Sequence, residues 1–448
     1  MKHNFWEYSR NIFENTKVSS HTGFSGDLKK TGEKTKEKTL LKLFDIGPQF
    51  SVSYSPLYRE TIPDLSTVII KHVPEPLNKQ RDVHGVSCRL LFEGNIDEIQ
   101  KSVRLKKSQK SDSIRNQTQD CQKFVKTRGY INDTLSEEEM MFPIAYSIMA
   151  YKSPEQFEIL LRAIYRPQNI YCVHIDNKTS DVVFEDFSSI TRCFQNVFLA
   201  SERISVQWGG KSVLTQELVC MKDLLRFKKW KYLINLTGQE FPLRTNSELV
   251  RILKIFNGSN EAEGILKRAN KDRWANAGQP PHKIRPIKGA VHVTVNRNFV
   301  EYSINNHVAK DFLAWVQKAG TVPDETFFAS LIHNPHLGIP GSFKGQVETD
   351  YSLKKPFLSR FKSWRDAPNY WPCHGHFVRG ICIFGLGDLP LLARRPEFFA
   401  NKFHIDYQPH TLLCLDQLLF NRTRDEYFGR LQFETDYYEN LEYIKNVV

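Results

Sequence analysis

The sequence predicts an α/β protein with a doubly wound, mainly parallel sheet. Strand-like and helix-like segments alternate along the middle of the chain, beginning near Phe142. Residues 142–176 give the clearest case, because an apolar strand, an amphipathic helix and a second apolar strand follow one another there. The second strand ends on Asp176. A carboxylate at that edge of an open α/β sheet is a candidate ligand-binding group, although an Asp that closes a strand is as often only a turn former.

Each element of this first unit has its own local signal. The strands are the apolar runs FPIAYSIMAY (142–151) and NIYCVHID (169–176). The helix between them is expected to have Ser153 as its N-cap, Pro154 as its first residue and Pro167 at its end. Its apolar side chains recur at i, i+3, i+4 and i+7, namely Phe157, Leu160, Leu161 and Ile164.

The alternation continues towards the C-terminus. Further strands are expected at 196–200, 231–236 and 289–295. Further helices are expected at 214–227, 247–256 and 311–318, with Asn257-Gly258 as the stop signal of the second. We therefore expect residues 141–430 to form one catalytic unit. Residues 1–75 are expected to be an irregular stem or tail, 76–140 an N-terminal cap tied to the core by cysteines, and 431–448 a C-terminal tail.

The chain has 448 residues, of which 40% are hydrophobic, so it is long enough to bury a large core. Its formal net charge is +12. Such a balance favours anionic partners such as phosphate-bearing substrates, nucleic acid or anionic membranes. Much of the excess lies in residues 29–42 and 101–110, which have the composition of solvated linkers. The charge is therefore no argument for nucleic-acid binding, and we expect none.

Eight cysteines are spread along the chain without zinc-ligand spacing. An even number fits four disulfides in an oxidising lumen, whereas the alternative is eight reduced, buried thiols. N-glycosylation sequons begin at Asn116, Asn132, Asn177, Asn235, Asn257 and Asn421. Asn235 is expected in a buried strand and so cannot be used. No apolar run is long enough for a transmembrane helix, and the first residues lack a signal-peptide pattern. We interpret this conflict as a truncated or mispredicted start.

Residues 371–403 contain the first chemical signal. Cys373 and Cys382 are close enough to staple a hairpin, Arg379 lies between them, and Lys402 follows near the end. Two cations placed in this way suit a diphosphate, because arginine offers a bidentate fork and lysine a point charge. The alternative is that both are ordinary surface cations. The chain has no Asp-x-Asp pair to hold a divalent metal against a nucleotide sugar.

The second signal is Thr321-Val-Pro-Asp-Glu325, which opens a predicted helix with Pro323 at its first position. Acidic residues suit the positive end of a helix dipole, so a purely structural role is the simpler interpretation. The functional interpretation is that Glu325 is a general base that accepts a proton from a sugar hydroxyl. The segment Gly210-Lys211-Ser212 is not a phosphate-binding P-loop, because Ser205 occupies the position of the required glycine.

These stretches together resemble one enzyme family. FPIAYSIMAY, LLRAIYRPQNIYCVHID, GQEFPLRTN, PDE, CHGHFVRGICIFGLGDLP and FANKF occur in this order between Phe142 and Phe403. The chain is thus similar to the β-1,6-N-acetylglucosaminyltransferases that branch mucin-type O-glycans, the core 2 and I-branching enzymes of glycosyltransferase family 14. The resemblance implies a GT-A-like nucleotide-sugar transferase fold, with a Rossmann-like, doubly wound mixed sheet and no DxD metal motif.

The resemblance also implies roles for individual residues. Glu325 matches the catalytic base, and no metal or other cofactor is implied. Asp176, Arg379 and Lys402 match the binding site of the UDP donor, with the two cations in place of a metal. Acceptor binding is implied for Glu263, Lys271, Arg273 and Trp364, with Trp274 in the same segment as Arg273. The implied disulfides are Cys88–Cys414, Cys121–Cys193, Cys172–Cys220 and Cys373–Cys382, and Thr237 replaces the family's unpaired cysteine.

Some positions depart from the family pattern. Lys288-Gly289-Ala290-Val291 stands where a Gly-Ser-Ala-Tyr run is usual, and Asp366 stands where an aromatic residue follows Trp364. The register of Lys271 is also doubtful, because its segment is one residue short. The changes at 288–291 and at Asp366 fall where the acceptor is expected, so the sequence leaves the acceptor glycan open.

The expected function is metal-independent, inverting transfer of GlcNAc from UDP-GlcNAc in β-1,6 linkage to an O-glycan or glycoprotein acceptor containing Gal or GalNAc. One alternative is an enzyme like the protein O-xylosyltransferases that uses UDP-xylose. Another is a catalytically silent glycan-binding homologue. By resemblance, the expected location is the Golgi membrane with a lumenal catalytic domain. The family's membrane anchor is not visible in this sequence, and a homodimer is possible.

Overall fold

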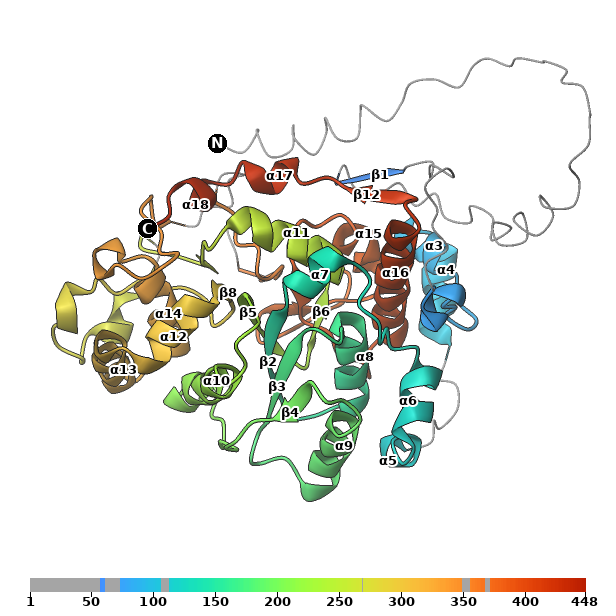
Figure 1. Cartoon of the computed structure of the whole chain (residues 1–448), viewed down its shortest axis with the longest axis horizontal. Helices are drawn as coiled ribbons and strands as arrows, with labels where there is room; N and C mark the ends of the chain where they lie inside the picture. The colour runs from blue at the N-terminus through green and yellow to red at the C-terminus, as the bar shows by residue number, and fades with distance from the viewer. Residues whose placement is uncertain (1–56, 61–72, 106–112, 268, 349–354, 367–370) are drawn as a thin grey trace, which may run out of the picture.

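A six-stranded mixed sheet forms the centre of the protein (Figure 1). The computed structural model describes residues 57–60, 73–105, 113–267, 269–348, 355–366 and 371–448. The strand order is β4-β3-β2-β5-β8-β7. The first four strands are parallel and β8 is antiparallel to both of its neighbours. The strands are β2 (Ile144–Ala150), β3 (Ile170–Ile175), β4 (Val197–Leu199), β5 (Tyr232–Thr237), β7 (Glu261–Ala262) and β8 (Val293–Asn296). This arrangement confirms the predicted α/β fold.

Helices cover this sheet as the alternating pattern predicted. Helix α10 packs on β2 and β3, while α8 packs between α9 and α16. Helices α12, α13 and α14 lie together beside the β7–β8 side of the sheet, at the left of Figure 1. The bounds of the helices from α8 onward are α8 (Pro154–Ile164), α9 (Asp181–Thr191), α10 (Lys211–Leu224), α11 (Asn246–Phe256), α12 (Arg297–Asn305), α13 (His307–Ala319), α14 (Asp324–Ile332), α15 (Leu389–Leu392), α16 (Pro409–Tyr427), α17 (Asp436–Glu439) and α18 (Glu442–Lys445). Of these, α9, α12, α15, α16, α17 and α18 were not predicted from the sequence.

Some predicted element ends differ from the structure. Ser153 occupies the N-cap position of α8, but its φ is 57° and its side chain makes no capping hydrogen bond. Pro323 is the N-cap of α14 instead of its first residue. The strand expected at 289–295 begins only at Val293, and Lys288, just before the expected range, pairs with Ile265 in an isolated bridge. Thr245 and Glu248, by contrast, form a complete capping box at the start of α11.

The N-terminal cap is bound to the core by disulfides. Cys88–Cys414 joins α3 to α16, and Cys121–Cys193 joins α6 to the end of α9. Cys172–Cys220 joins β3 to α10, and Cys373–Cys382 closes a hairpin. All four pairs are those that the family resemblance implied. The short elements of the cap are η2 (Glu75–Asn78), α3 (Cys88–Phe92), α4 (Ile96–Arg104), α5 (Ile114–Gln117), α6 (Cys121–Arg128) and α7 (Glu137–Met141).

The two ends of the described chain meet in one small sheet. Strand β1 (Tyr58–Glu60) pairs with β12 (Leu431–Phe433), although most of the expected stem lies outside the described residues. Residues 431–448, expected as a tail, carry α17 and α18 along the upper surface in Figure 1. Their side chains Tyr438, Leu441 and Tyr443 are buried in the main core. This segment is therefore part of the folded unit.

Two further expectations concern the sequon at Asn235 and membrane-spanning helices. Asn235 is buried on β5, where it donates a hydrogen bond to Val291 and accepts one from Val293, as expected for an unused sequon. Within the described ranges, no helix combines the length and hydropathy needed to cross a bilayer.

We predict that Tyr443→Ala strongly destabilises the protein. The side chain is 3% exposed and packs edge-on against Phe256, so its removal should cost about 3–5 kcal/mol. Met141→Ala is the control, because Met141 is 66% exposed and its truncation should change stability by less than about 0.5 kcal/mol. Thermal unfolding of both variants measures the difference. Equal melting temperatures would show that residues 431–448 are a dispensable tail.

Candidate active site

Glu325 lies in the first turn of α14, and its carboxylate is bound by cations from two other segments. Its Oε2 accepts a hydrogen bond from Arg273 Nη1 at 3.1 Å and lies 3.9 Å from Lys288 Nζ. The side chain remains 31% exposed. The backbone is fixed on both sides, because Glu325 N donates to Val322 O at 3.1 Å and Glu325 O accepts from Gly289 N at 2.6 Å. Glu325 thus presents an oriented, accessible carboxylate.

A second carboxylate, Glu263, lies next to the same cations. Lys288 Nζ is 3.6 Å from Glu263 Oε2, so this lysine is shared between Glu263 and Glu325. Burial raises the pKa of Glu263, whereas the positive charges of Lys362 and Lys288 lower it by a larger amount. The net shift of the Glu263 pKa is therefore downward. Burial also lowers the pKa of Lys362, which Glu263 partly offsets. The site therefore holds interleaved opposite charges, which suit the recognition of a polyhydroxylated ligand.

Gly289 allows these two carboxylates to approach each other. A Cβ at this position would lie 2.5 Å from the Ala329 side chain and 2.5 Å from the Glu263 carbonyl oxygen. Any side chain would therefore push the Glu263 segment away from α14. This close approach explains why glycine stands beside Lys288 in the segment that departs from the family pattern.

The predicted acceptor segment is only partly at this site. Residues Lys271–Trp274 form the single turn η3. Trp274 Nε1 donates to Thr326 Oγ1 at 3.1 Å, and this bond fixes the turn to α14 next to Glu325. Arg273 reaches Glu325, whereas Lys271 is exposed and its role stays a prediction. Lys288 and Lys362 are the lysines at the carboxylates.

Asp324, the neighbour of Glu325, is buried and carries an unusual pKa. Burial raises its pKa to about 7, and the negative charge of Glu325 acts in the same direction. Its Oδ1 has no hydrogen-bond partner among the described residues. A protonated Asp324 leaves Glu325 as the charged group of this turn, since two adjacent carboxylates would repel each other.

Arg379 projects from a stapled hairpin, as predicted. Strands β9 (His376–Val378) and β10 (Ile381–Ile383) pair in antiparallel fashion around a two-residue turn. Both turn residues have positive φ, 51° at Arg379 and 83° at Gly380, as a type I′ hairpin turn requires. Arg379 is exposed. Besides the disulfide, Asp388 holds the hairpin base by accepting hydrogen bonds from the backbone of His374 and Gly385.

Lys402 lies alongside this hairpin. It directly follows β11 (Phe399–Asn401), and its carbonyl oxygen accepts a hydrogen bond from Phe384 N just after β10. Burial lowers the pKa of Lys402, and the positive charges of Lys152 and Arg379 lower it further, against the opposing effect of Glu240. The rings of His376 and His404 are 6.5 Å apart. Arg379 and Lys402 therefore belong to one positively charged surface.

Asp176 follows β3 at the carboxyl edge of the sheet. Its Oδ1 accepts hydrogen bonds from Lys178 N at 2.9 Å and Val206 N at 3.4 Å. Its Oδ2 lies 3.6 Å from Lys178 Nζ. One carboxylate oxygen is thus used to order the loop, and a ribose hydroxyl would have to approach the other.

Trp364 lies against the stapled hairpin. It forms an isolated bridge with Ile381, and its ring lies 3.8 Å from the position of a Cβ on Gly380. The indole is 43% exposed. Because Lys362 is only two residues away, the same short segment contributes to both groups of charged residues.

The carboxylate of Glu240 connects the two groups. Glu240 begins β6 (Glu240–Pro242), which pairs with β11. Its Oε2 accepts a hydrogen bond from Arg360 Nε at 2.8 Å, and its Oε1 accepts one from Asn401 Nδ2 at 2.8 Å and lies 2.7 Å from His292 Nε2. Burial would raise the pKa of Glu240, but Arg360 and His292 lower it to about 2. These contacts hold the segments of Lys288, Lys362 and Lys402 together.

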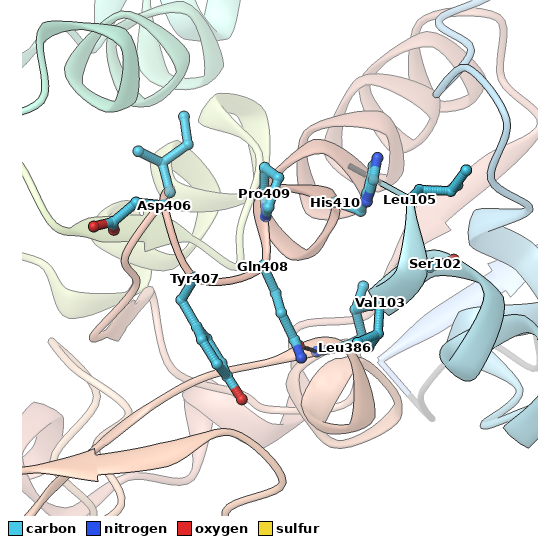
Figure 2. A pocket seen from close by; sticks show the side chains of 10 residues that line it. Ser102, Val103, Leu105, Leu386, Asp406, Tyr407, Gln408, Pro409 and His410 are labelled. Atoms are coloured by element: carbon cyan, nitrogen blue, oxygen red, sulfur yellow. Dashed lines mark hydrogen bonds between the residues drawn. The ribbon is translucent and has the colours of Figure 1, made fainter. Parts of the chain in front are cut away.

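Two cavities in the described part of the chain lie away from Glu325. One of about 130 Å³ lies between α4 and the loop that leads into α16, where Gln408 accepts a hydrogen bond from the backbone of Leu386 (Figure 2). A groove of about 1020 Å³ lies between the cap and α16, against Arg81 and Phe420. Cys373, Cys382 and Asp388 also form a cluster of metal-ligand types, but both sulfurs are used in the disulfide. None of these features contains Glu325.

Sequence reasoning missed several members of this site. Glu240 was part of the GQEFPLRTN stretch, and Lys362 lies two residues before the predicted Trp364. Glu240 and His292 could have been found, because each is a polar residue within a mostly apolar, strand-like run. Arg360 could not have been found in this way, because its partner Glu240 is 120 residues away in the sequence.

We predict that Arg360→Ala costs about 3–5 kcal/mol of stability, because it leaves the buried Glu240 carboxylate without its main counter-charge. Arg89→Ala is the matched control. The exposed Arg89–Glu93 pair should contribute less than about 1 kcal/mol. Urea unfolding compares the two variants, and equal losses would show that Glu240 is not the organising charge.

We also predict that Asp324→Asn changes the pH dependence of stability. A carboxyl group whose folded-state pKa is raised to about 7 stabilises the fold while protonated, and this stabilisation is lost as the pH rises through 7. Asn removes the titration. The melting temperature of the variant relative to the parent should therefore increase between pH 5 and pH 8. A difference independent of pH in this range would contradict a raised pKa at Asp324.

Comparison with known proteins identifies the family. The family model of the core-2/I-branching enzymes matches residues 144–392. A human β-1,3-galactosyl-O-glycosyl-glycoprotein β-1,6-N-acetylglucosaminyltransferase is 37% identical over 75% of this chain and 85% of its own length. A human N-acetyllactosaminide β-1,6-N-acetylglucosaminyl-transferase is 37% identical over 68% of this chain and 79% of its own length. A Danio rerio relative, β-1,3-galactosyl-O-glycosyl-glycoprotein β-1,6-N-acetylglucosaminyltransferase 4, is 35% identical over 77% and 85%. The chain therefore belongs to the core-2/I-branching enzyme family.

Proposed function

We propose that the protein is an inverting transferase that moves GlcNAc from UDP-GlcNAc to the C6 hydroxyl of a Gal- or GalNAc-containing O-glycan. The observation that carries this proposal is the accessible Glu325 carboxylate, held by Arg273 and connected through Glu240 to the positively charged surface of Arg379 and Lys402. The similar proteins are named as β-1,6-N-acetylglucosaminyltransferases, which supports the sugar and the linkage.

In the proposed reaction, Glu325 is the general base. It accepts the proton of the acceptor hydroxyl while that oxygen attacks the anomeric carbon of the donor sugar. The attack comes from the face opposite UDP, so the α-linked donor gives a β-linked product. The anomeric C–O bond to the β-phosphate breaks as the new bond forms, and UDP leaves with the electron pair.

Negative charge then develops on the departing diphosphate. Arg379 can bind two phosphate oxygens with its guanidinium, and Lys402 supplies a second positive charge from a partly buried position. The stapled hairpin fixes Arg379 before the donor arrives, which limits the reorganisation required during the reaction. We therefore propose that the transfer needs no divalent metal and no other cofactor.

The acceptor would bind on the other side of Glu325. Glu263 and Lys288 offer acceptor and donor groups to sugar hydroxyls within a few ångströms of the base. Lys288 stands where the family pattern differs, so the choice of acceptor should depend on it. Trp364 and Lys271 remain proposed acceptor contacts.

The proposed location is the Golgi lumen. Four disulfides fit an oxidising compartment, and glycan-processing relatives act on glycoproteins. The family's membrane anchor and a homodimer remain expectations.

We predict that Glu325→Gln lowers kcat by roughly 10²–10⁴-fold, in the range for loss of a general base. Glu301→Gln, on the exposed face of α12, is the control and should retain full activity. The assay measures GlcNAc transfer from UDP-GlcNAc to Galβ1-3GalNAc and polylactosamine acceptors, with and without EDTA. Near-normal turnover by Glu325→Gln, or loss of the parent activity in EDTA, would refute the mechanism.

The same assay separates the alternatives. Transfer from UDP-xylose to a serine peptide, with none from UDP-GlcNAc, would indicate the xylosyltransferase reaction instead. Calorimetric binding of glycan without turnover of any UDP-sugar would indicate a silent glycan-binding protein.

A further inference from the structure

Trp208 is exposed in an unusual place. Its side chain is 81% exposed, the largest exposed fraction among the exposed large hydrophobic side chains of the described residues. It lies in the loop between β4 and α10, outside the residues given a role above. An indole kept in water contributes nothing to packing, whereas aromatic rings supply large apolar contact areas to bound ligands.

The turn that carries Trp208 is held in one conformation by hydrogen bonds. Gly210 N donates to Gln207 O at 3.0 Å, which closes a four-residue turn with Trp208 at its second position. Gly209 follows with a φ of 74°, which glycine adopts readily. Gln207 N also donates to Ser212 Oγ at 2.8 Å, at the start of α10. The exposure of Trp208 is thus built into a defined turn.

The same loop is bonded to both ends of the proposed donor path. On one side, Val206 N donates to Asp176 Oδ1 at 3.4 Å, the proposed uridine carboxylate. On the other side, Gly209 O accepts a hydrogen bond from Val322 N at 2.9 Å, and Val322 O accepts one from Glu325 N. Val206 and Gly209 are three residues apart, so they are separated by at most about 11 Å. Trp208 lies within this short span.

The acceptor side is bonded to α14 through a different segment. Glu325 O accepts its hydrogen bond from Gly289, next to Lys288 and near Glu263. The start of α14 is therefore joined by one hydrogen bond to the segment of the proposed acceptor residues and by another to the Trp208 loop. A nucleotide sugar placed between Asp176 and Glu325, as in the proposed function, would run beside the Trp208 loop, because this loop is bonded to both segments.

We infer that Trp208 packs against the transferred sugar of the donor and thereby helps to select it. The apolar face of a pyranose ring offers C–H groups to the indole, while its hydroxyls remain free to bind polar groups. UDP itself ends before this position. Trp208 should therefore contribute to the binding of UDP-sugars and not to that of UDP. This inference rests on the proposed function, because it places the donor between Asp176 and Glu325.

The test compares calorimetric Kd values for UDP and UDP-GlcNAc without acceptor. Trp208→Ala should weaken UDP-GlcNAc binding roughly five- to tenfold and leave the Kd for UDP within about twofold. Trp208→Phe retains a flat ring and should restore most of the affinity. Val182→Ala, which shortens a side chain that is 64% exposed on α9, is the control and should change neither Kd.

Three outcomes would overturn the inference. They are an unchanged Kd for UDP-GlcNAc in Trp208→Ala, equal weakening of UDP and UDP-GlcNAc, or a rise confined to the KM of the acceptor. Failure of the proposed function gives a different result. If the parent protein binds UDP but not UDP-GlcNAc, the proposed donor is wrong, and the same Kd ratio measured with UDP-xylose decides the role of Trp208. If the parent binds none of these ligands, both proposals fail.

Discussion

The buried contact between Glu240 and Arg360 is the interaction on which the site depends. Both side chains are fully buried, and a carboxylate in that position is stable only with a counter-charge and hydrogen bonds. The partners of Glu240 come from three other parts of the chain, since His292 and Asn401 contact the same carboxylate as Arg360. Each partner is close in sequence to a charged residue of the site. One buried carboxylate therefore sets the positions of groups that are far apart in sequence.

The charged residues of the site form two groups, one with mixed charges and one with positive charges. Near Glu325, negative and positive side chains alternate, so hydroxyl groups of a neutral glycan find both acceptors and donors. Around Arg379 and Lys402 the charge is positive, which suits a diphosphate. Burial raises the pKa of Asp324, so a protonated Asp324 spares the first turn of α14 a second negative charge. Glu240 and its partners connect the segments that carry these two groups of charges.

The sequence predicted local features better than long-range ones. The strands of the parallel half were found because buried strands are continuous apolar runs. Helix α16 was missed, because its long buried surface mixes Asp416, Gln417 and Arg422 with apolar residues, and no periodic pattern results. Glu325 and Arg379 were found through motifs. The contacts of Lys288 and Lys362 follow from tertiary packing at Gly289 and Arg360, which no local pattern encodes.

Lys288 is the residue of this site that should most affect the choice of acceptor. It occupies a segment in which the family pattern has small residues and a tyrosine, and its ammonium group lies between Glu263 and Glu325. A lysine there partly satisfies both carboxylates before any acceptor binds. An acceptor must then compete with an internal ion pair or use the lysine itself as a hydrogen-bond donor. We therefore expect the acceptor to carry an oxygen that accepts a hydrogen bond from Lys288.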